Sequence, residues 1–246
     1  MRFLIFTDIH GNLEALEAMF KFVARKKINH YLFMGDLVGY GASPNETIDR
    51  VKQLEPLAII RGNHDKAVCG LDSIETFNPI AVSAISWSRT EISKPNAKFL
   101  CRLKKGPLII NEQVSLCHGA PFDEDFYIFG EFDAAEAFHY LPTRIGFFGH
   151  THFPVLYIKE GNTVRGHPLE GDHGAIRLKK TARYLINPGS VGQPRDRNSK
   201  AACAIYDSTE ATLHHYRFEY DIRAAQAKIR RQNLPAALAE RLSLGI

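Results

Sequence analysis

The chain has 246 residues, of which 45% are hydrophobic and 24% charged, with 18 Gly and 12 Pro. This profile is typical of a folded globular protein and excludes disordered, collagen-like and coiled-coil chains, so we expect one domain over residues 1–246. The formal charge of +4 comes from 31 basic and 27 acidic residues with the basic pairs scattered along the chain, which argues against a stable nucleic-acid complex.

The start of the chain and its cysteines bear on location. The apolar stretch Phe3 to Phe6 is far too short for a secretory signal or a membrane span, so we expect a cytoplasmic protein with no membrane segment. The cysteines show neither CxxC spacing nor a zinc-finger arrangement, so disulfide bonds and structural zinc are not expected. The four cysteines are Cys69, Cys101, Cys117 and Cys203.

The first 65 residues alternate strand-like apolar runs with helical periodicity, which predicts βαβ units and a parallel sheet. Each predicted strand ends in a Gly-containing loop that carries Asp or His. Because open α/β sheets bind ligands beyond the carboxyl ends of their strands, the three loops predict one shared site. The predicted strands are 3–6, 31–34 and 57–60, and the predicted helices are 13–23 and 44–54.

The remainder of the chain is predicted to complete and cover this sheet. Segment 66–105 is expected to be helical, and a terminal helical segment, 221–244, is expected to dock with a solvated basic face and a break at Pro235. Both segments are candidate surfaces for a homo-oligomer, and the sequence does not choose between them. The strand-rich region between them predicts a second sheet packed on the first, with strands at 114–117, 145–148, 155–158, 184–186, 202–206 and 212–216.

Chemically active side chains fall in five short motifs, each at the end of a predicted strand. Any one motif is more often structural, because Asp frequently caps a helix and a lone His is frequently a core residue. Five such motifs at strand ends predict a common cleft. The motifs are Asp8-Ile9-His10, Gly35-Asp36, Gly62-Asn63-His64-Asp65, His118-Gly119 and Gly149-His150-Thr151-His152.

These motifs offer imidazole, carboxylate and amide ligands without a thiolate. Such a set favours Mn²⁺ or Fe, with Zn²⁺, Co²⁺ or Ni²⁺ as alternatives, over copper, iron–sulfur clusters or Ca²⁺. The number of ligands is too large for one ion. Two divalent metal ions that share a carboxylate would use all of them.

In their order and spacing the motifs resemble the calcineurin-like metallophosphoesterases, whose signature is D-x-H, G-D, G-N-H-(D/E), H and G-H-x-H. The resemblance implies an α/β fold, a four-layer αββα sandwich of two packed mixed β-sheets flanked by helices. It also implies that the metal ligands are Asp8, His10 and His152 for one ion, Asn63, His118 and His150 for the other, and Asp36 as the bridge between them.

The same resemblance implies catalytic roles for two further residues. His64 would lie beside the substrate phosphate, where it protonates the leaving group or stabilises the transition state. Asp65 would orient the His64 imidazole. A water molecule activated between the two cations would attack phosphorus.

Substrate contacts are predicted on weaker grounds. Besides Asn63, the candidates are Tyr40, which follows the Gly35-Asp36 loop, and Arg195, which lies in a Gly/Pro-rich loop. Turn packing explains Tyr40 equally well, and an exposed surface arginine explains Arg195 better. The aromatic run 122–129 is a candidate pocket wall or base-stacking surface, with simple packing the favoured interpretation.

The sequence therefore predicts a metal-dependent phosphoesterase. We expect it to hydrolyse phosphodiester, phosphomonoester or phosphoanhydride bonds of a small, nucleotide-like substrate. One alternative is a phosphoprotein phosphatase, and another is a non-catalytic metal-binding scaffold on the same fold. A scaffold has no need for His64 together with a complete ligand set, which favours catalysis.

Overall fold

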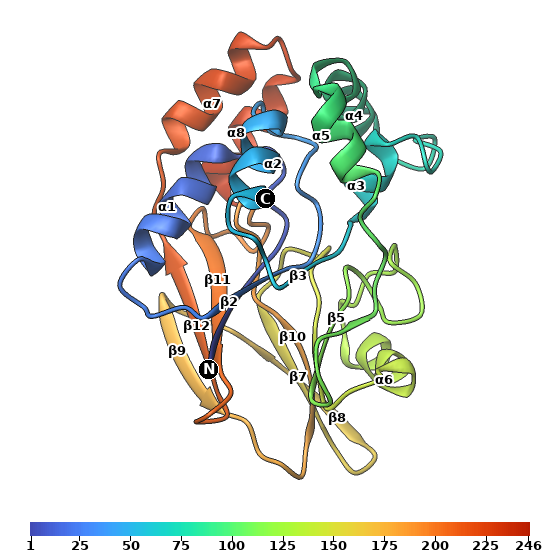
Figure 1. Ribbon diagram of the computed structural model, residues 1–246, viewed down its shortest axis with the longest axis vertical. Helices are drawn as coiled ribbons and strands as arrows, with labels where there is room; N and C mark the ends of the chain where they lie inside the picture. The colour runs from blue at the N-terminus through green and yellow to red at the C-terminus, as the bar shows by residue number, and fades with distance from the viewer.

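The computed structural model describes residues 1–246 as two mixed six-stranded sheets with helices around them (Figure 1). The first sheet has the strand order β3 (Ala58–Ile59), β2 (His30–Phe33), β1 (Arg2–Phe6), β11 (Ala201–Asp207), β12 (Thr212–Phe218) and β9 (His173–Arg177). The second sheet has the order β4 (Leu108–Ile109), β5 (Val114–Leu116), β6 (Ile145–Phe147), β10 (Arg183–Asn187), β7 (Val155–Glu160) and β8 (Thr163–Pro168).

Parallel pairing brings the ends of several strands to one edge. In the first sheet β1 runs parallel to β2, with Phe3 opposite His30, and β2 runs parallel to β3. In the second sheet β6 runs parallel to both β5 and β10. The loops that leave these strands carry all five sequence motifs, so the topology gathers the motifs at one place.

The two faces of each sheet are buried in different cores, as the twofold periodicity of a strand requires. On β1, Phe3 and Ile5 pack into a core of 19 buried residues that includes Val114 and Ile145 of the second sheet. The alternate residue Phe6 packs into a separate core shared with the helices. Burial on both faces explains the continuous apolar run in β1.

The helices cover the sheets and one end of the sandwich. In Figure 1, α6 lies beside the second sheet and α1 beside the first, while α4, α5, α7 and α8 gather at the top. No helix has the length and apolar character needed to cross a membrane. The helices are α1 (Leu13–Val23), α2 (Pro44–Lys52), α3 (Asn63–Val68), α4 (Pro79–Glu91), α5 (Lys94–Leu100), α6 (Glu131–Tyr140), α7 (Ile222–Arg231) and α8 (Ala236–Leu244).

The sandwich of two mixed sheets flanked by helices confirms the predicted fold class. Segment 66–105 contains the helices α4 and α5, and the terminal segment divides into α7 and α8 around Pro235. Strands β8 and β9 were not predicted. Each is the last strand of its sheet and alternates between exposed and half-buried residues, so neither needs an apolar run.

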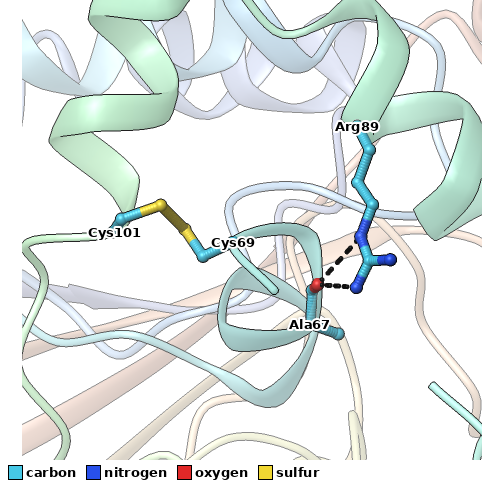
Figure 2. The surroundings of a disulfide bond; sticks show 4 residues. All are labelled: Ala67, Cys69, Arg89 and Cys101. Carbon is cyan, nitrogen blue, oxygen red and sulfur yellow. Dashed lines mark hydrogen bonds between the residues drawn. A yellow bond between two sulfur atoms is a disulfide. The ribbon is translucent and has the colours of Figure 1, made fainter. Parts of the chain in front are cut away.

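The absence of disulfide bonds was wrongly predicted. Cys69 at the end of α3 and Cys101 at the end of α5 form a disulfide with their Cα atoms 5.4 Å apart (Figure 2). The guanidinium of Arg89 also donates two hydrogen bonds to the carbonyl oxygen of Ala67. The two cysteines are 32 residues apart along the chain, and their pairing could not be predicted because only the fold brings the ends of α3 and α5 together. Cys117 and Cys203 are free and buried, as packing residues are.

Candidate metal centre

The loops that carry the candidate ligands hold several of them in an unusual backbone conformation. Asp8, His10, Asp36, His150 and His152 all have positive φ, between 50° and 65°. A left-handed backbone is unfavourable for residues with a Cβ and persists only where surrounding contacts impose it. In this protein those contacts include backbone hydrogen bonds between loops, such as the Asp8 N–H to Gly35 and the His10 N–H to Asp36.

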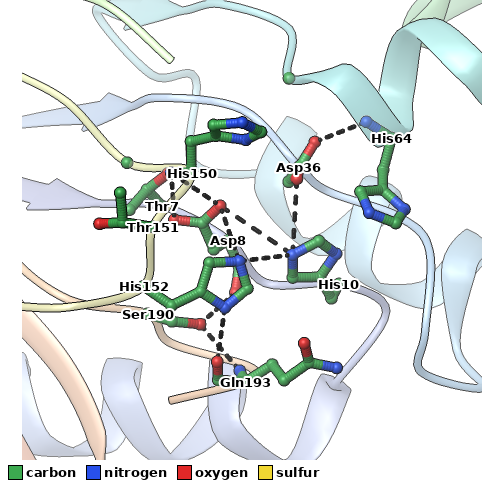
Figure 3. A network of polar contacts seen from close by, with 12 residues as sticks. Thr7, Asp8, His10, Asp36, His64, His150, Thr151, His152, Ser190 and Gln193 are labelled. Carbon is green, nitrogen blue, oxygen red and sulfur yellow. Dashed lines mark hydrogen bonds and ion pairs between the residues drawn. The ribbon is translucent and has the colours of Figure 1, made fainter. Parts of the chain in front are cut away.

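The first cluster joins Asp8, His10, Asp36 and His152, all buried, with their side chains turned toward one another (Figure 3). His10 Nε2 lies 3.1 Å from His152 Nε2 and 3.5 Å from Asp36 Oδ2. His152 Nε2 is also 3.4 Å from Asp8 Oδ1. The four side chains come from three different loops and enclose one small volume.

The second cluster shares Asp36 and adds His118 and His150. His118 Nε2 lies 3.4 Å from Asp36 Oδ2 and 3.1 Å from Asn63 Oδ1. The Asp36 Oδ2 atom therefore approaches one histidine of each cluster, His10 and His118, at nearly equal distances. All seven predicted ligands are brought together, and Asp36 has the position of a bridge.

The hydrogen bonds of the imidazoles suit a cation. Nδ1 of His10, His118 and His152 each faces a backbone carbonyl oxygen, at 3.1, 2.8 and 2.5 Å. A carbonyl only accepts hydrogen bonds, so each Nδ1 carries the proton and Nε2 is left to bind a metal. In the first cluster this places two Nε2 lone pairs 3.1 Å apart, an arrangement that a cation between them stabilises. The residues present therefore fit divalent metal ions.

The pKa shifts agree with this chemistry. Burial lowers the pKa of His150 to about 3 and the pKa values of His10 and His152 well below 6.5, so these rings are neutral at neutral pH, the form in which an imidazole can bind a metal. Burial opposes the protonation of His118, but the charge of Asp36, its hydrogen bond to the ring and the charge of Asp8 together outweigh burial and raise the pKa of His118 to about 10. A bound cation would replace the proton that Asp36 holds on His118.

A sequence model of the calcineurin-like phosphoesterases matches residues 1–154, the part of the chain that contains every candidate ligand. The chain belongs to the calcineurin-like phosphoesterase family. It is 38% identical to an uncharacterized protein of Methanocaldococcus jannaschii over 98% of this chain and 97% of that one. This family membership supports a phosphoester hydrolase with divalent metal ions.

Two solved structures extend the similarity over the whole chain. A metallophosphoesterase from Sphaerobacter thermophilus is 34% identical, with 100% of this chain and 99% of that chain covered and a TM-score of 0.87. A hypothetical protein from Pyrococcus horikoshii is 17% identical, with 100% and 98% coverage and a TM-score of 0.78, which shows the shared fold. The phosphoesterase fold therefore includes the C-terminal third of this chain.

His64 lies at the edge of the two clusters. Its ring packs edge-on against His10, with centroids 4.8 Å apart, and its backbone N–H donates to Asp36 Oδ1. Burial lowers the pKa of His64 to about 4, so the ring is neutral at neutral pH. Nδ1 is buried without a partner, and Nε2 makes no hydrogen bond within the protein, which leaves Nε2 free for a substrate.

The predicted contact between Asp65 and the His64 imidazole is wrong. The Asp65 carboxylate accepts hydrogen bonds from four backbone N–H groups, those of Gly62, Asp36, Leu37 and Val38. Successive residues of a helix do not face each other, so Asp65 at the start of α3 points away from the His64 ring. Its role in the structure is to fix the loop that carries Asp36.

A cavity of about 440 Å³ opens beside the centre, and its lining includes Tyr40, Asn63, His64, Tyr127 and His150. Tyr127 stacks on His150 with the ring centroids 3.8 Å apart, so part of the predicted aromatic run does reach the site. The run is not a free stacking platform, because the ring of Phe129 stacks on Tyr127 as well.

Tyr40 and Arg195 are both brought to the edge of the site. The Tyr40 ring is 4.7 Å from the ring of His10, and the Arg195 guanidinium carbon is 5.7 Å from the centre of the Tyr40 ring. Sequence reasoning missed Arg241 of α8, whose guanidinium carbon is 5.5 Å from the same ring. No motif marks Arg241, and the basic pattern of the terminal segment predicted only a solvated face.

Proposed function

We propose that this chain is a dinuclear metal-dependent phosphoesterase and that residues 1–246 form one catalytic domain. The observation that carries the proposal is the convergence of the predicted ligands into two clusters that share Asp36. One ion would be held by Asp8, His10 and His152, and the other by Asn63, His118 and His150.

Two bound ions would neutralise the phosphate oxygens and lower the pKa of a water molecule, so that hydroxide is available near neutral pH. The residues of the chain then position the substrate. Asn63 and His64 line the cavity, and the neutral His64 ring can donate a hydrogen bond from Nε2 to the oxygen of the leaving group. Arg195 would compensate negative charge on the phosphate, because no carboxylate side chain pairs with it.

The finer features of the sequence prediction belong to this proposal. Mn²⁺ or Fe is the expected metal, because imidazole and carboxylate ligands without thiolate suit these ions. A small nucleotide-like phosphodiester, phosphomonoester or phosphoanhydride is the expected substrate class, since a cavity of about 440 Å³ accommodates a small molecule. We expect the protein to act in the cytoplasm.

A phosphoprotein phosphatase is the alternative that the cavity allows, because its wall is partly open at the exposed residues Asp72, Thr76 and Asn78. A phosphoserine peptide tests it directly. Faster turnover of that peptide than of small phosphate esters would select the phosphoprotein phosphatase over the small-molecule enzyme.

The decisive experiment compares the wild-type protein with His64→Ala after removal of metal and addition of Mn²⁺. The substrates are p-nitrophenyl phosphate, bis-p-nitrophenyl phosphate and diadenosine tetraphosphate, and elemental analysis reports the bound metal. We expect Mn²⁺-dependent turnover by the wild type and a loss of roughly 10²–10⁴-fold in His64→Ala, the range of a general acid–base group. The variant should keep its metal, since His64 is not a ligand in this proposal.

The other outcomes are equally informative. Metal loss from His64→Ala would make His64 a ligand instead of a substrate contact. A wild-type protein with two ions in place and no turnover on any phosphate ester, the phosphopeptide included, would favour the non-catalytic scaffold.

A further inference from the structure

Two arginines from distant parts of the chain meet over one tyrosine ring at the edge of the centre. The guanidinium carbons of Arg195 and Arg241 lie 5.7 and 5.5 Å from the centroid of the Tyr40 ring. Tyr40 itself packs against His64, with ring centroids 4.4 Å apart. Arg241 comes from α8, whereas Arg195 comes from the loop between β10 and β11, so the fold assembles this pair.

Neither arginine is paired with a side-chain carboxylate. Arg195 donates from Nε and Nη2 to Gln193 Oε1, and Arg241 donates from Nε to the main-chain oxygen of Ile246 at 2.6 Å. Both side chains are half-buried. Burial, followed by the charge of Arg195, lowers the pKa of Arg241, which shows that the two cations affect each other. Two half-buried guanidinium groups that pair with no Asp or Glu side chain are suited to bind an anion, and phosphate fits their planar donors.

Both arginines lie within electrostatic reach of the site. Arg195 acts electrostatically on Asp8, His10, His152 and His64. Arg241 acts on His64 as well. Arg241 is not part of the lining of the cavity that contains His64.

The shape of the surface places Arg241 next to that cavity. The cavity of about 440 Å³ that contains His64 and Tyr40 has Asn78 on its wall. A second hollow, of about 400 Å³, has Asn78 and Arg241 on its wall. Because Asn78 borders both hollows, a substrate that reacts beside His64 can extend past Asn78 to Arg241.

We propose that Arg241 binds a phosphate carried by the leaving group, beside the attacked phosphate whose charge Arg195 compensates, so that the preferred substrate is a phosphoanhydride. This rests on the proposed function and names its substrate class. In the reaction the oxygen of water bonds to the attacked phosphorus, and the bridging P–O bond breaks. The bridging oxygen leaves with the bonding electrons on the second phosphate, whose charge Arg241 compensates. The protons of the water pass to solvent and, as pH dictates, to the released phosphates.

A binding measurement tests the proposed phosphate site at Arg241 and does not require turnover. Calorimetry on Mn²⁺-loaded protein compares imidodiphosphate, a non-hydrolysable diphosphate, with orthophosphate. We expect the wild type to prefer imidodiphosphate and Arg241→Gln to weaken its binding by roughly 10- to 100-fold, the effect of one charge-assisted contact. Arg241→Lys should restore part of the affinity. Arg230→Gln, which removes an exposed charge from α7, is the matched control and should change neither affinity.

Hydrolysis rates test whether Arg241 contacts the leaving group. In Arg241→Gln, kcat/KM should fall by roughly 10- to 100-fold for pyrophosphate and change less than about twofold for p-nitrophenyl phosphate, whose leaving group carries no phosphate. Equal losses on both substrates would make Arg241 a structural residue and overturn the proposal.

The two proposals can fail separately. Equal wild-type affinity for imidodiphosphate and orthophosphate, or a preference that Arg241→Gln retains, would overturn the phosphate site even in an active phosphoesterase. An inactive wild type whose preference for imidodiphosphate requires Arg241 would instead reject hydrolysis and support the phosphate site.

Discussion

In Asp65→Asn an NH₂ group replaces one carboxylate oxygen. Both oxygens of the Asp65 carboxylate accept two backbone hydrogen bonds each. Oδ2 accepts from the N–H groups of Asp36 and Gly62 at 2.8 and 3.0 Å, and Oδ1 accepts from those of Leu37 and Val38 at 2.9 and 3.3 Å. The amide of Asp65→Asn can serve only one of these pairs. Its NH₂ group then faces two N–H donors, and both remain unpaired in a buried site.

The size of the effect follows from these contacts. A hydrogen bond to a charged group contributes about 1.5–3 kcal/mol, so the loss of two should lower the free energy of unfolding by about 3–6 kcal/mol. That is a large part of the 5–15 kcal/mol that is typical of a whole protein. Each of the two pairs includes an N–H group of the loop that carries Asp36, so the affinity for both metal ions should fall as well.

Burial and the charge of Asp36 raise the pKa of Asp65 to about 7, so this carboxylate is ionised at pH 8. Urea unfolding of the metal-free protein at pH 8 therefore measures the decrease in the free energy of unfolding. The matched control is Asp133→Asn in α6, where Oδ2 accepts from the N–H groups of Phe129 and Gly130 in a half-buried turn outside both ligand clusters. The control substitution should lower the free energy of unfolding by a smaller amount and leave metal binding intact. If Asp65→Asn kept the wild-type stability and the full metal content but lost turnover, the reasoning would be refuted. Asp65 would then act in catalysis through His64.

Three further outcomes are expected. Asp36→Asn should lose both metal ions, because Oδ2 approaches a histidine of each cluster; elemental analysis that finds two ions at full occupancy would exclude a shared ligand. Burial lowers the pKa of His215 to about 4 from its ordinary 6.5, so the unfolded chain takes up the proton first and stability is lost as pH falls from 6.5 to 4. His215→Leu should therefore reduce the difference between urea midpoints at pH 7 and pH 5, and an unchanged difference would contradict this. Cys69→Ser combined with Cys101→Ser should lower the free energy of unfolding by roughly 3–4 kcal/mol for a loop of this length. Reduction of the wild type should give the same loss in thermal unfolding, whereas no loss would argue against the disulfide.

The sequence was most informative where burial alone determines which residues can occur. Strand β1 is buried on both faces, so its apolar run could be recognised, and the motif after it could be placed at the end of a strand. The exposed edge strands β8 and β9 gave no such signal. The candidate ligands were predictable because their order along the chain resembles a known family.

Features that depend on packing between distant segments escaped prediction. The disulfide requires α3 and α5 to end side by side, and Arg241 reaches Tyr40 only because α8 folds back over the site. The positive φ of five candidate ligands is equally unreadable, because neighbouring loops impose it. Adjacent position in the sequence also misled the prediction for Asp65, since it says nothing about which way a side chain points.

The order of strands in the first sheet bears on how the protein is made. All seven candidate ligands lie before residue 153, yet β1 pairs on one side with β11, so that Leu4 faces Ile205. The backbone of Asp8 is likewise held by Ser190 and Gly192. On the ribosome the ligands therefore emerge long before the segments that fix them, and pairing across some 200 residues is slow compared with local folding. Metal ions would meet an unfinished site during synthesis, and a stable centre forms only once the last third of the chain has joined the sheet.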